Sequence, residues 1–254
     1  MVNSSEFRPS TKLKALKAIE HVKSFLVLTM IALALTVIPL SPPVSAQPLN
    51  SWSSTTSYPT GIASTGIASQ SCATNSGFIY CVGGTSPSPT SAVYFAPITS
   101  SGVGPWTLSA FPYGAPAVPT GVPIERESCV TNSGFIYCVG GNPSLPTSAV
   151  YFAPISSSGV GTWTPTTSYP FSITEQSCVA RASFVFCVGG LSFPIGPTID
   201  VFFAPISSSG VGTWTSTNSY PFTIFEQSCV TRASLIYCVG GNPPILPTSA
   251  VFFG

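Results

Sequence analysis

The sequence predicts an all-β protein, a β-propeller of four-stranded blades, and three recurring features predict it. A tryptophan, a pair of cysteines and a Gly-Gly pair each occur four times along residues 47–254, always in that order. The Gly-Gly pairs, which begin at Gly83, Gly140, Gly189 and Gly240, are 57, 49 and 51 residues apart. A period near 50 residues with these landmarks is typical of propeller blades rather than of helical solenoids. The 22 glycines and 26 prolines add many turns and leave little room for helix.

The first 46 residues form a leader that differs from the rest of the chain. Five of the eight basic residues lie there, and an apolar run of 16 residues, from Phe25 to Leu40, follows Lys23. As a helix, this run is shorter than a hydrocarbon core of about 30 Å. The small residues Val44-Ser45-Ala46 then offer a cleavage site. Residues 1–46 are therefore predicted to be a signal helix, with an uncleaved membrane anchor as the alternative. Both place residues 47–254 outside the cytoplasm, secreted or at the cell surface.

The second repeat illustrates how each blade is expected to form. Strands are predicted at 127–131, 135–139 and 149–153, with a fourth around Trp163. The second and third of these strands are apolar without alternation. A sheet with one wet face would alternate, whereas a blade packed between two neighbours has both faces buried.

Several motifs in this repeat resemble one known family. Phe-Ile-Tyr-Cys-Val-Gly-Gly, then Ala-Val-Tyr-Phe-Ala-Pro, then Trp163 resemble a kelch repeat, and the resemblance covers residues 50–254. The chain departs from the family in its paired cysteines and in a longer stretch before the tryptophan. It also has phenylalanine where the family usually has tyrosine before Ala-Pro (Phe95, Phe152 and Phe203). The resemblance implies four kelch-like blades in residues 47–254.

Two interpretations exist for the number of blades in the ring. The repeats begin with a fourth-strand signature at Trp52 and end with a third-strand signature at 251–253. If these ends meet, the Trp52 strand completes the last blade, and four blades close a ring without a free edge. Kelch rings usually have six or seven blades, so the four repeats are equally consistent with part of a larger ring.

The cysteines are expected to form four disulfides, each within one hairpin. With a two-residue turn at Ser76-Gly77, Cys72 faces Cys81 in a non-hydrogen-bonded pair, where Cα atoms lie about 4.5 Å apart. The same register gives the pairs Cys72–Cys81, Cys129–Cys138, Cys178–Cys187 and Cys229–Cys238. Free buried thiols are the alternative. Metal binding is disfavoured because the only histidine, His21, lies in the leader. An even number of cysteines in an exported chain favours the disulfides.

Half of the charged residues that follow the leader are expected at one rim of the channel. In a propeller the first strand of each blade lines the channel, and the residues just before it lie at one rim. The predicted polar patch consists of Gln70, Arg126, Glu127, Glu175, Gln176, Glu226 and Gln227. The opposite rim would present the hairpin turns, with Asn75, Asn132, Arg181 and Arg232. The alternative for the patch is structural: such recurring side chains can hydrogen-bond neighbouring blades, and Arg181 or Arg232 can pair with a carboxylate.

An enzymatic function finds little support in the sequence. Residues 47–254 contain no histidine, so neither a histidine-ligated copper site, as in the kelch-like galactose oxidases, nor a Ser-His-Asp triad can form there. No catalytic residue, metal or cofactor is therefore predicted. Glu127, Glu175 and Glu226 leave open a carboxylate pair for glycoside cleavage. Three arginines against five acids in this region provide no electrostatic attraction for nucleic acid.

The function expected from these observations is binding, by an exported or cell-surface adhesion module that recognises a protein or glycan. The rim patch and the loops between second and third strands would carry the contacts. A hydrolase or lyase with acids in the channel, and a structural protein that assembles with itself, are the alternatives. A membrane contact is expected only through an uncleaved leader.

Overall fold

The computed structural model describes residues 51–59, 66–115, 118–243 and 246–254. The predicted leader, residues 1–46, lies outside the described residues. The chain divides into two compact units, Met1–Trp52 and Ser53–Gly254, and the second contains the repeats. Within the part that the structure describes, no helix is long and apolar enough to cross a membrane.

Four antiparallel sheets, which we number as blades 1 to 4, contain most of the strands. Blade 1 contains β1 (Ser71–Asn75), β2 (Phe78–Val82), β3 (Val93–Thr99), β4 (Gly102–Val103) and β5 (Thr107–Leu108). Blade 2 contains β6 (Ser128–Asn132), β7 (Phe135–Val139), β8 (Val150–Ser156), β9 (Gly159–Val160) and β10 (Thr164–Pro165). Blade 3 contains β12 (Ser177–Arg181), β13 (Phe184–Val188), β16 (Val201–Ser207), β17 (Gly210–Val211) and β18 (Thr215–Ser216). Blade 4 contains β19 (Ser228–Arg232), β20 (Leu235–Val239) and β21 (Val251–Phe253).

A small fifth sheet forms at the rim beside blade 3. It contains β11 (Ile173–Thr174), β14 (Leu191–Ser192) and β15 (Gly196–Pro197), in the order β11-β14-β15. It joins the residues that precede β12 to the loop between β13 and β16, so this loop lies against the start of its own blade.

The hairpin at the start of each blade has the predicted register. Cys72 faces Cys81 across a turn in which Ser76 and Gly77 both have positive φ, 48° and 81°. Two positive φ angles match a type I′ turn, whose twist suits a two-residue hairpin. The other three hairpins have the same pairing.

The four predicted disulfides are confirmed. Their Cα atoms lie 4.0–4.1 Å apart, as expected for non-hydrogen-bonded pairs. Among the described residues no free cysteine is left. Four disulfides indicate an oxidising environment outside the cytoplasm.

The outer half of blades 1 to 3 differs from the prediction. In blade 2 the third strand continues past the predicted end at Ala153 to Ser156, where it pairs with β9. The fourth strand begins at Thr164, just after Trp163, and its two residues pair with Phe152 and Tyr151. The long stretch before the tryptophan therefore forms an additional short hairpin.

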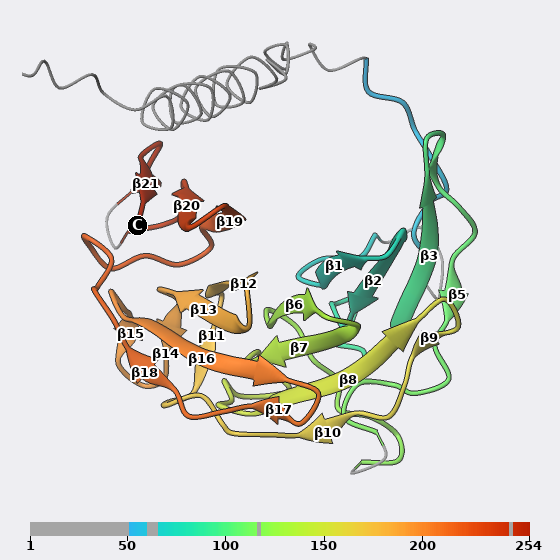
Figure 1. Cartoon of the computed structure of the whole chain (residues 1–254), viewed down its shortest axis with the longest axis horizontal. Helices are drawn as coiled ribbons and strands as arrows, with labels where there is room; N and C mark the ends of the chain where they lie inside the picture. Colours follow the sequence, from blue (N-terminus) through green and yellow to red (C-terminus); the bar gives the residue numbers. More distant parts are fainter. Residues whose placement is uncertain (1–50, 60–65, 116–117, 244–245) are drawn as a thin grey trace, which may run out of the picture. The chain divides into compact units, whose positions relative to one another are not determined.

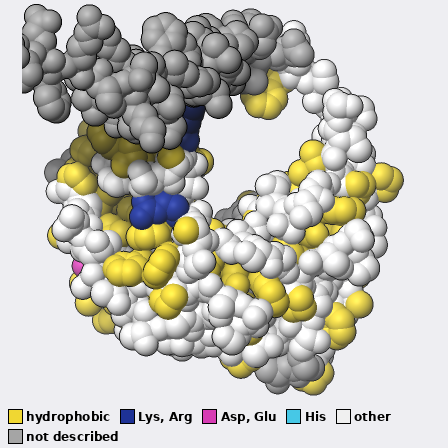
Figure 2. Space-filling view, in the orientation of Figure 1, with side chains coloured by type: hydrophobic (Ala, Val, Ile, Leu, Met, Phe, Trp, Pro, Cys, Tyr) yellow, Lys and Arg dark blue, Asp and Glu magenta, His cyan; other side chains and the backbone are white. Residues whose placement is uncertain are grey.

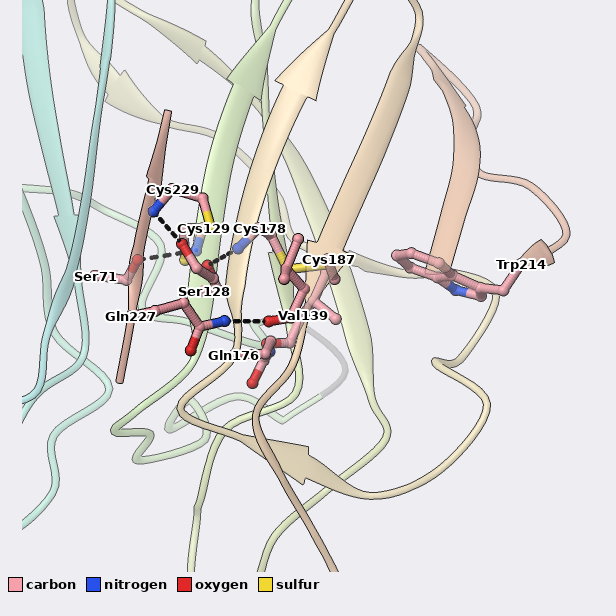
Figure 3. The surroundings of a disulfide bond; sticks show 12 residues. Ser71, Ser128, Cys129, Val139, Gln176, Cys178, Cys187, Trp214, Gln227 and Cys229 are labelled. Atoms are coloured by element: carbon pink, nitrogen blue, oxygen red, sulfur yellow. Dashed lines mark hydrogen bonds between the residues drawn. A yellow bond between two sulfur atoms is a disulfide. The ribbon is translucent and has the colours of Figure 1, made fainter. Parts of the chain in front are cut away.

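Successive blades are joined along their first strands. β1 contacts β6, β6 contacts β12, and β12 contacts β19, and these strands lie on the inner side of the sheets in Figure 1. One serine hydroxyl per junction accepts a hydrogen bond from a backbone N–H of the next blade. The bonds run from Cys129 to Ser71, from Cys178 to Ser128 and from Cys229 to Ser177, at 2.8–2.9 Å (Figure 3).

The hydrophobic core lies between blades rather than within one. The first cluster joins Tyr80 and Val82 of blade 1 to Ile136 and Cys138 of blade 2, and two further clusters join blades 2 to 3 and 3 to 4. Each interior sheet therefore buries both faces, which explains the continuous apolar strands.

Within Ser53–Gly254, the described parts of blades 1 and 4 are not neighbours. β21 is the outermost described strand of blade 4. Cys72 on blade 1 and Val230 on blade 4 are both exposed, so these two blades do not cover each other.

Candidate functional site

The candidate site is built on a backbone turn that recurs before the first strand of each blade. Ser69, Arg126, Glu175 and Glu226 occupy the same position in the four repeats, and each has φ between 57° and 60°. Residues other than glycine seldom adopt this left-handed conformation, which costs about 1–3 kcal/mol.

Hydrogen bonds between blades hold this turn. The N–H groups of Arg126, Glu175 and Glu226 each donate to the carbonyl of the corresponding residue in the preceding blade, at 2.9–3.1 Å. The turns therefore form one chain of backbone hydrogen bonds from blade 1 to blade 4. Because every blade contributes the same turn, the side chains on either side of it converge.

All seven side chains of the predicted rim patch line one pocket. The pocket has a volume of about 260 Å³ and is lined by Ser69, Gln70, Arg126, Glu127, Glu175, Gln176, Glu226 and Gln227. Of these, Ser69 was not singled out from the sequence. Its repeat position, equivalent to Arg126, was the signal that could have identified it. That the pocket binds a ligand stays a prediction.

Two glutamines in the pocket also hold neighbouring blades together. The Nε2 atom of Gln176 donates to the Val139 carbonyl at 2.7 Å, and that of Gln227 to the Val188 carbonyl at 2.5 Å. Figure 3 shows both glutamines beside the Ser–Cys bonds of the same junctions. The Nε2 atoms of both glutamines therefore have the structural role considered above: they hydrogen-bond the neighbouring blade. Their Oε1 atoms are buried and have no hydrogen-bond partner.

Glu127 takes the place of this glutamine in blade 2. It is 6% exposed, and neither carboxyl oxygen accepts a hydrogen bond of normal geometry, although the backbone N–H groups of Glu127 and Ser71 favour its charged form. A Cβ built on Gly83 would lie 3.1 Å from Glu127 Oε1, and one on Gly140 would lie 3.0 Å from Gln176 Nε2. The carboxyl therefore occupies the position in which the other blades carry an amide donor.

Burial raises the pKa of Glu127 to about 8, although the backbone N–H groups of Glu127 and Ser71 lower it and the Glu125 charge adds a smaller increase. At neutral pH the carboxyl is therefore mostly protonated. In this form it has an O–H donor where the glutamines have an N–H.

The charged residues at the pocket mouth form a partly exposed pair. Arg126 Nη1 donates to Glu175 Oε1 at 2.6 Å. The pKa of Glu175 is nevertheless raised, because burial outweighs the Arg126 charge and Glu226 adds repulsion. Glu226 accepts a hydrogen bond from Asn242 of its own blade. The mouth therefore presents one cation beside two acids, and the pocket behind it is rich in acceptors.

At the opposite rim, two side chains of the hairpin turns hydrogen-bond the turn of the next blade. Asn132 Nδ2 donates to the Ala182 carbonyl at 2.5 Å, and Arg181 donates to the Ser234 carbonyl. Arg181 also lies 4.9 Å from the centre of the Phe186 ring. These contacts tie successive hairpin turns together, and Arg181 uses a carbonyl instead of the carboxylate that was considered.

In the described part of the chain, no three His, Cys, Asp or Glu side chains are grouped in a way that could hold a metal ion. What the pocket mouth offers chemically is hydrogen bonding by the Arg126–Glu175 pair and the exposed Glu226.

Comparison with solved structures supports the kelch-like assignment of the fold. The structure of YjhT, a kelch-repeat propeller protein, matches with a TM-score of 0.57 and 15% sequence identity. The match covers 74% of this chain and 62% of the YjhT chain, so the chain spans less than two thirds of that protein. At this identity the likeness shows the fold alone. No family model matches the sequence, and no curated protein does.

Proposed function

We propose that the protein is an exported or cell-surface binding module, built on a kelch-like propeller, whose rim pocket recognises a glycan. The observation that carries the proposal is the polar lining of the rim pocket, whose mouth holds the partly exposed Arg126–Glu175 pair and the exposed Glu226. Charged and polar side chains that converge on a pocket can hydrogen-bond a polar ligand. Sugar hydroxyls both donate and accept hydrogen bonds, so they suit this lining.

The loops around the pocket add apolar contact area. Leu145, Phe193, Ile195 and Leu246 lie in the loops between second and third strands and are 53–85% exposed. Asn142 in one such loop bonds Glu125, next to the rim turn. An amphiphilic surface of this kind, with a polar centre and apolar tips, suits a glycan or a glycosylated protein.

A glycan array probed with the purified chain tests the proposal. Glu226 is exposed, so Glu226→Gln changes the pocket mouth without removing a core contact. Arg126→Gln removes the cation of the mouth. We expect each variant to weaken binding at least tenfold. Asp200→Asn, which changes an acid outside the pocket, should bind like the parent protein.

Two outcomes would contradict the glycan proposal: no binding to any glycan, or binding that none of the pocket variants alters. Attachment to cells that persists after periodate oxidation of their glycans would show a protein ligand instead.

The enzymatic alternative rests on one observation, the pKa of about 8 at Glu127, which suits a general acid. If the pocket cleaves glycosides, sugar release from oligosaccharides will disappear in Glu127→Gln. If it only binds, no release will occur with either protein.

A further inference from the structure

Each of the first three blades seats its tryptophan on a tyrosine of the segment that leads into the blade. Trp106 packs on Tyr58, Trp163 on Tyr113 and Trp214 on Tyr169, edge to face, with ring centres 4.9–5.0 Å apart. The indole N–H groups of Trp106 and Trp214 donate to the carbonyls of Thr56 and Thr167 in these segments. The tryptophan therefore fixes the outer edge of each blade.

Blade 4 has the tyrosine, but no described tryptophan contacts it. A cavity of about 460 Å³ lies beside Tyr220 and is also lined by 217–219, Phe252 and Phe253. These residues correspond to those that hold Trp214 in blade 3. We refer to this cavity as the tryptophan socket of blade 4.

Blade 4 also leaves one face open. Val230, Val239 and Val251 are 58%, 49% and 59% exposed, whereas the corresponding residues of blade 2, Val130, Val139 and Val150, are at most 6% exposed. Figure 2 shows hydrophobic side chains at the surface over the last sheet. In blade 2 this face is covered by blade 3.

Blade 1 leaves the complementary face open. Cys72 is exposed, whereas Cys129 and Cys178, at the same position in blades 2 and 3, are 7% exposed. A Cβ on Gly159 would touch Phe95 of the preceding blade, and one on Gly210 would touch Phe152. The nearest neighbours of Gly102 in blade 1 all belong to Thr55.

We propose that a second copy of this chain docks head to tail on blade 4. The second copy's Trp52 enters the socket beside Tyr220, its neighbouring residues pair with β21 as a fourth strand, and its blade 1 covers the open face of blade 4.

The chain connectivity at the other junctions supports this arrangement. Trp163 directly precedes β10, the last strand of blade 2, and three residues after Trp163, Thr166 donates to the Val211 carbonyl of blade 3. Trp52 precedes Thr55 by the same interval, and Thr55 donates to the Val103 carbonyl of blade 1. A Trp52 segment that completes one blade therefore leads directly into a blade that lies next to it.

Two further contacts follow from the repeat. Tyr80 and Tyr137 donate across a junction to the carbonyls of Ser156 and Ser207, so Tyr237 should donate to the second copy's Thr99. Phe253, which is 71% exposed, should lie against the second copy's Gly102. An interface of this kind joins two different surfaces, and it either closes into a ring or continues as a filament.

Light scattering on the purified chain, combined with a complementation experiment, tests the proposal. Trp52→Ala removes the donor side, Phe253→Asp disrupts the acceptor side, and Leu145→Ala, on a loop, is the control. The parent chain and the control should have at least twice the mass of one chain. Each interface variant should dissociate at least tenfold more readily, because buried tryptophans are frequent hot spots.

Mixing the two defective variants distinguishes this arrangement from a symmetric contact. One chain then supplies an intact Trp52 segment and the other an intact socket, so one functional junction forms and a 1:1 complex should appear. Circular dichroism spectra of the variants, compared with that of the parent chain, will establish whether each variant is folded. A single-chain mass for the parent protein at about 100 μM would overturn the proposal, as would assembly that neither variant weakens or a mixture that forms no complex.

Discussion

Blades 2 and 4 have nearly the same sequence in the hairpin formed by their first two strands, but the residues of these hairpins differ greatly in burial. Val139 is fully buried and Val239 is 49% exposed, although both end a strand of type Ile-Tyr-Cys-Val. Tyr137 and Tyr237 differ in the same way. Tyr137 is 1% exposed and donates a hydrogen bond to blade 3, whereas Tyr237 is only partly buried. The repeat therefore specifies the strands, and the neighbouring blade determines how much each residue contributes to stability.

The glycine that ends the second strand gives the largest expected contrast between these blades. A Cβ on Gly140 would lie 2.4 Å from the Ile173 carbonyl oxygen, whereas one on Gly240 would have only the Thr248 oxygen nearby, at 3.7 Å. Both glycines have positive φ, so alanine is strained at either position. We expect Gly140→Ala to lower the free energy of unfolding by about 4 kcal/mol and Gly240→Ala by about 1 kcal/mol.

Urea unfolding of the two variants measures this difference. Equal losses would show that backbone strain alone explains the glycines, without the contact to the next blade.

The blades also differ at the rim, where blade 2 has Glu127 and the other blades have a glutamine. The folded-state pKa of Glu127, about 8, exceeds the ordinary value of about 4.3 for glutamate. The folded protein thus binds the proton more tightly, and its stability should fall as pH rises from about 4 to about 8. At pH 7, Glu127→Gln should raise the free energy of unfolding by about 3 kcal/mol.

The reciprocal variant provides the control. Gln176→Glu places an acid at the equivalent junction and should introduce the same loss of stability with rising pH. Glu125, Tyr58 and Tyr113 interact electrostatically with Glu127 and are unchanged in both variants. A pH profile that is identical for parent and Glu127→Gln would mean that the carboxyl does not titrate in this range.

Truncation of the paired valines should produce the smallest of the three effects. Val139→Ala removes two buried methyl groups and leaves a cavity, which should cost about 2 kcal/mol. Val239→Ala should cost less than about 0.5 kcal/mol in the isolated chain, because its side chain is half exposed.

If a second copy covers blade 4, the Val239→Ala loss will grow with protein concentration, while the Val139→Ala loss will not. Thermal unfolding at two concentrations separates these cases.

Hairpins, disulfides and rim positions could be predicted because they depend on local rules. The two-residue turn at Ser76-Gly77 fixes the Cys72–Cys81 register without reference to the rest of the chain. The convergence of Gln70, Arg126, Glu175 and Glu226 followed from their position just before the first strand of each blade. The predicted strand 149–153 ends before Pro154, whereas β8 continues through Pro154 because Ile155 and Ser156 pair with β9, a contact that the strand pattern alone does not specify.

The sequence by itself determined the strands, their register, the disulfides and the set of side chains at the rim, because turn chemistry and continuous apolar strand patterns act over a few residues. The tertiary structure alone decided which identical residues are buried, that Glu127 lies without a partner in an amide's position, and that blades 1 and 4 keep complementary faces open. These properties depend on contacts between repeats about 50 residues apart, and a local pattern carries no information about which neighbour is present.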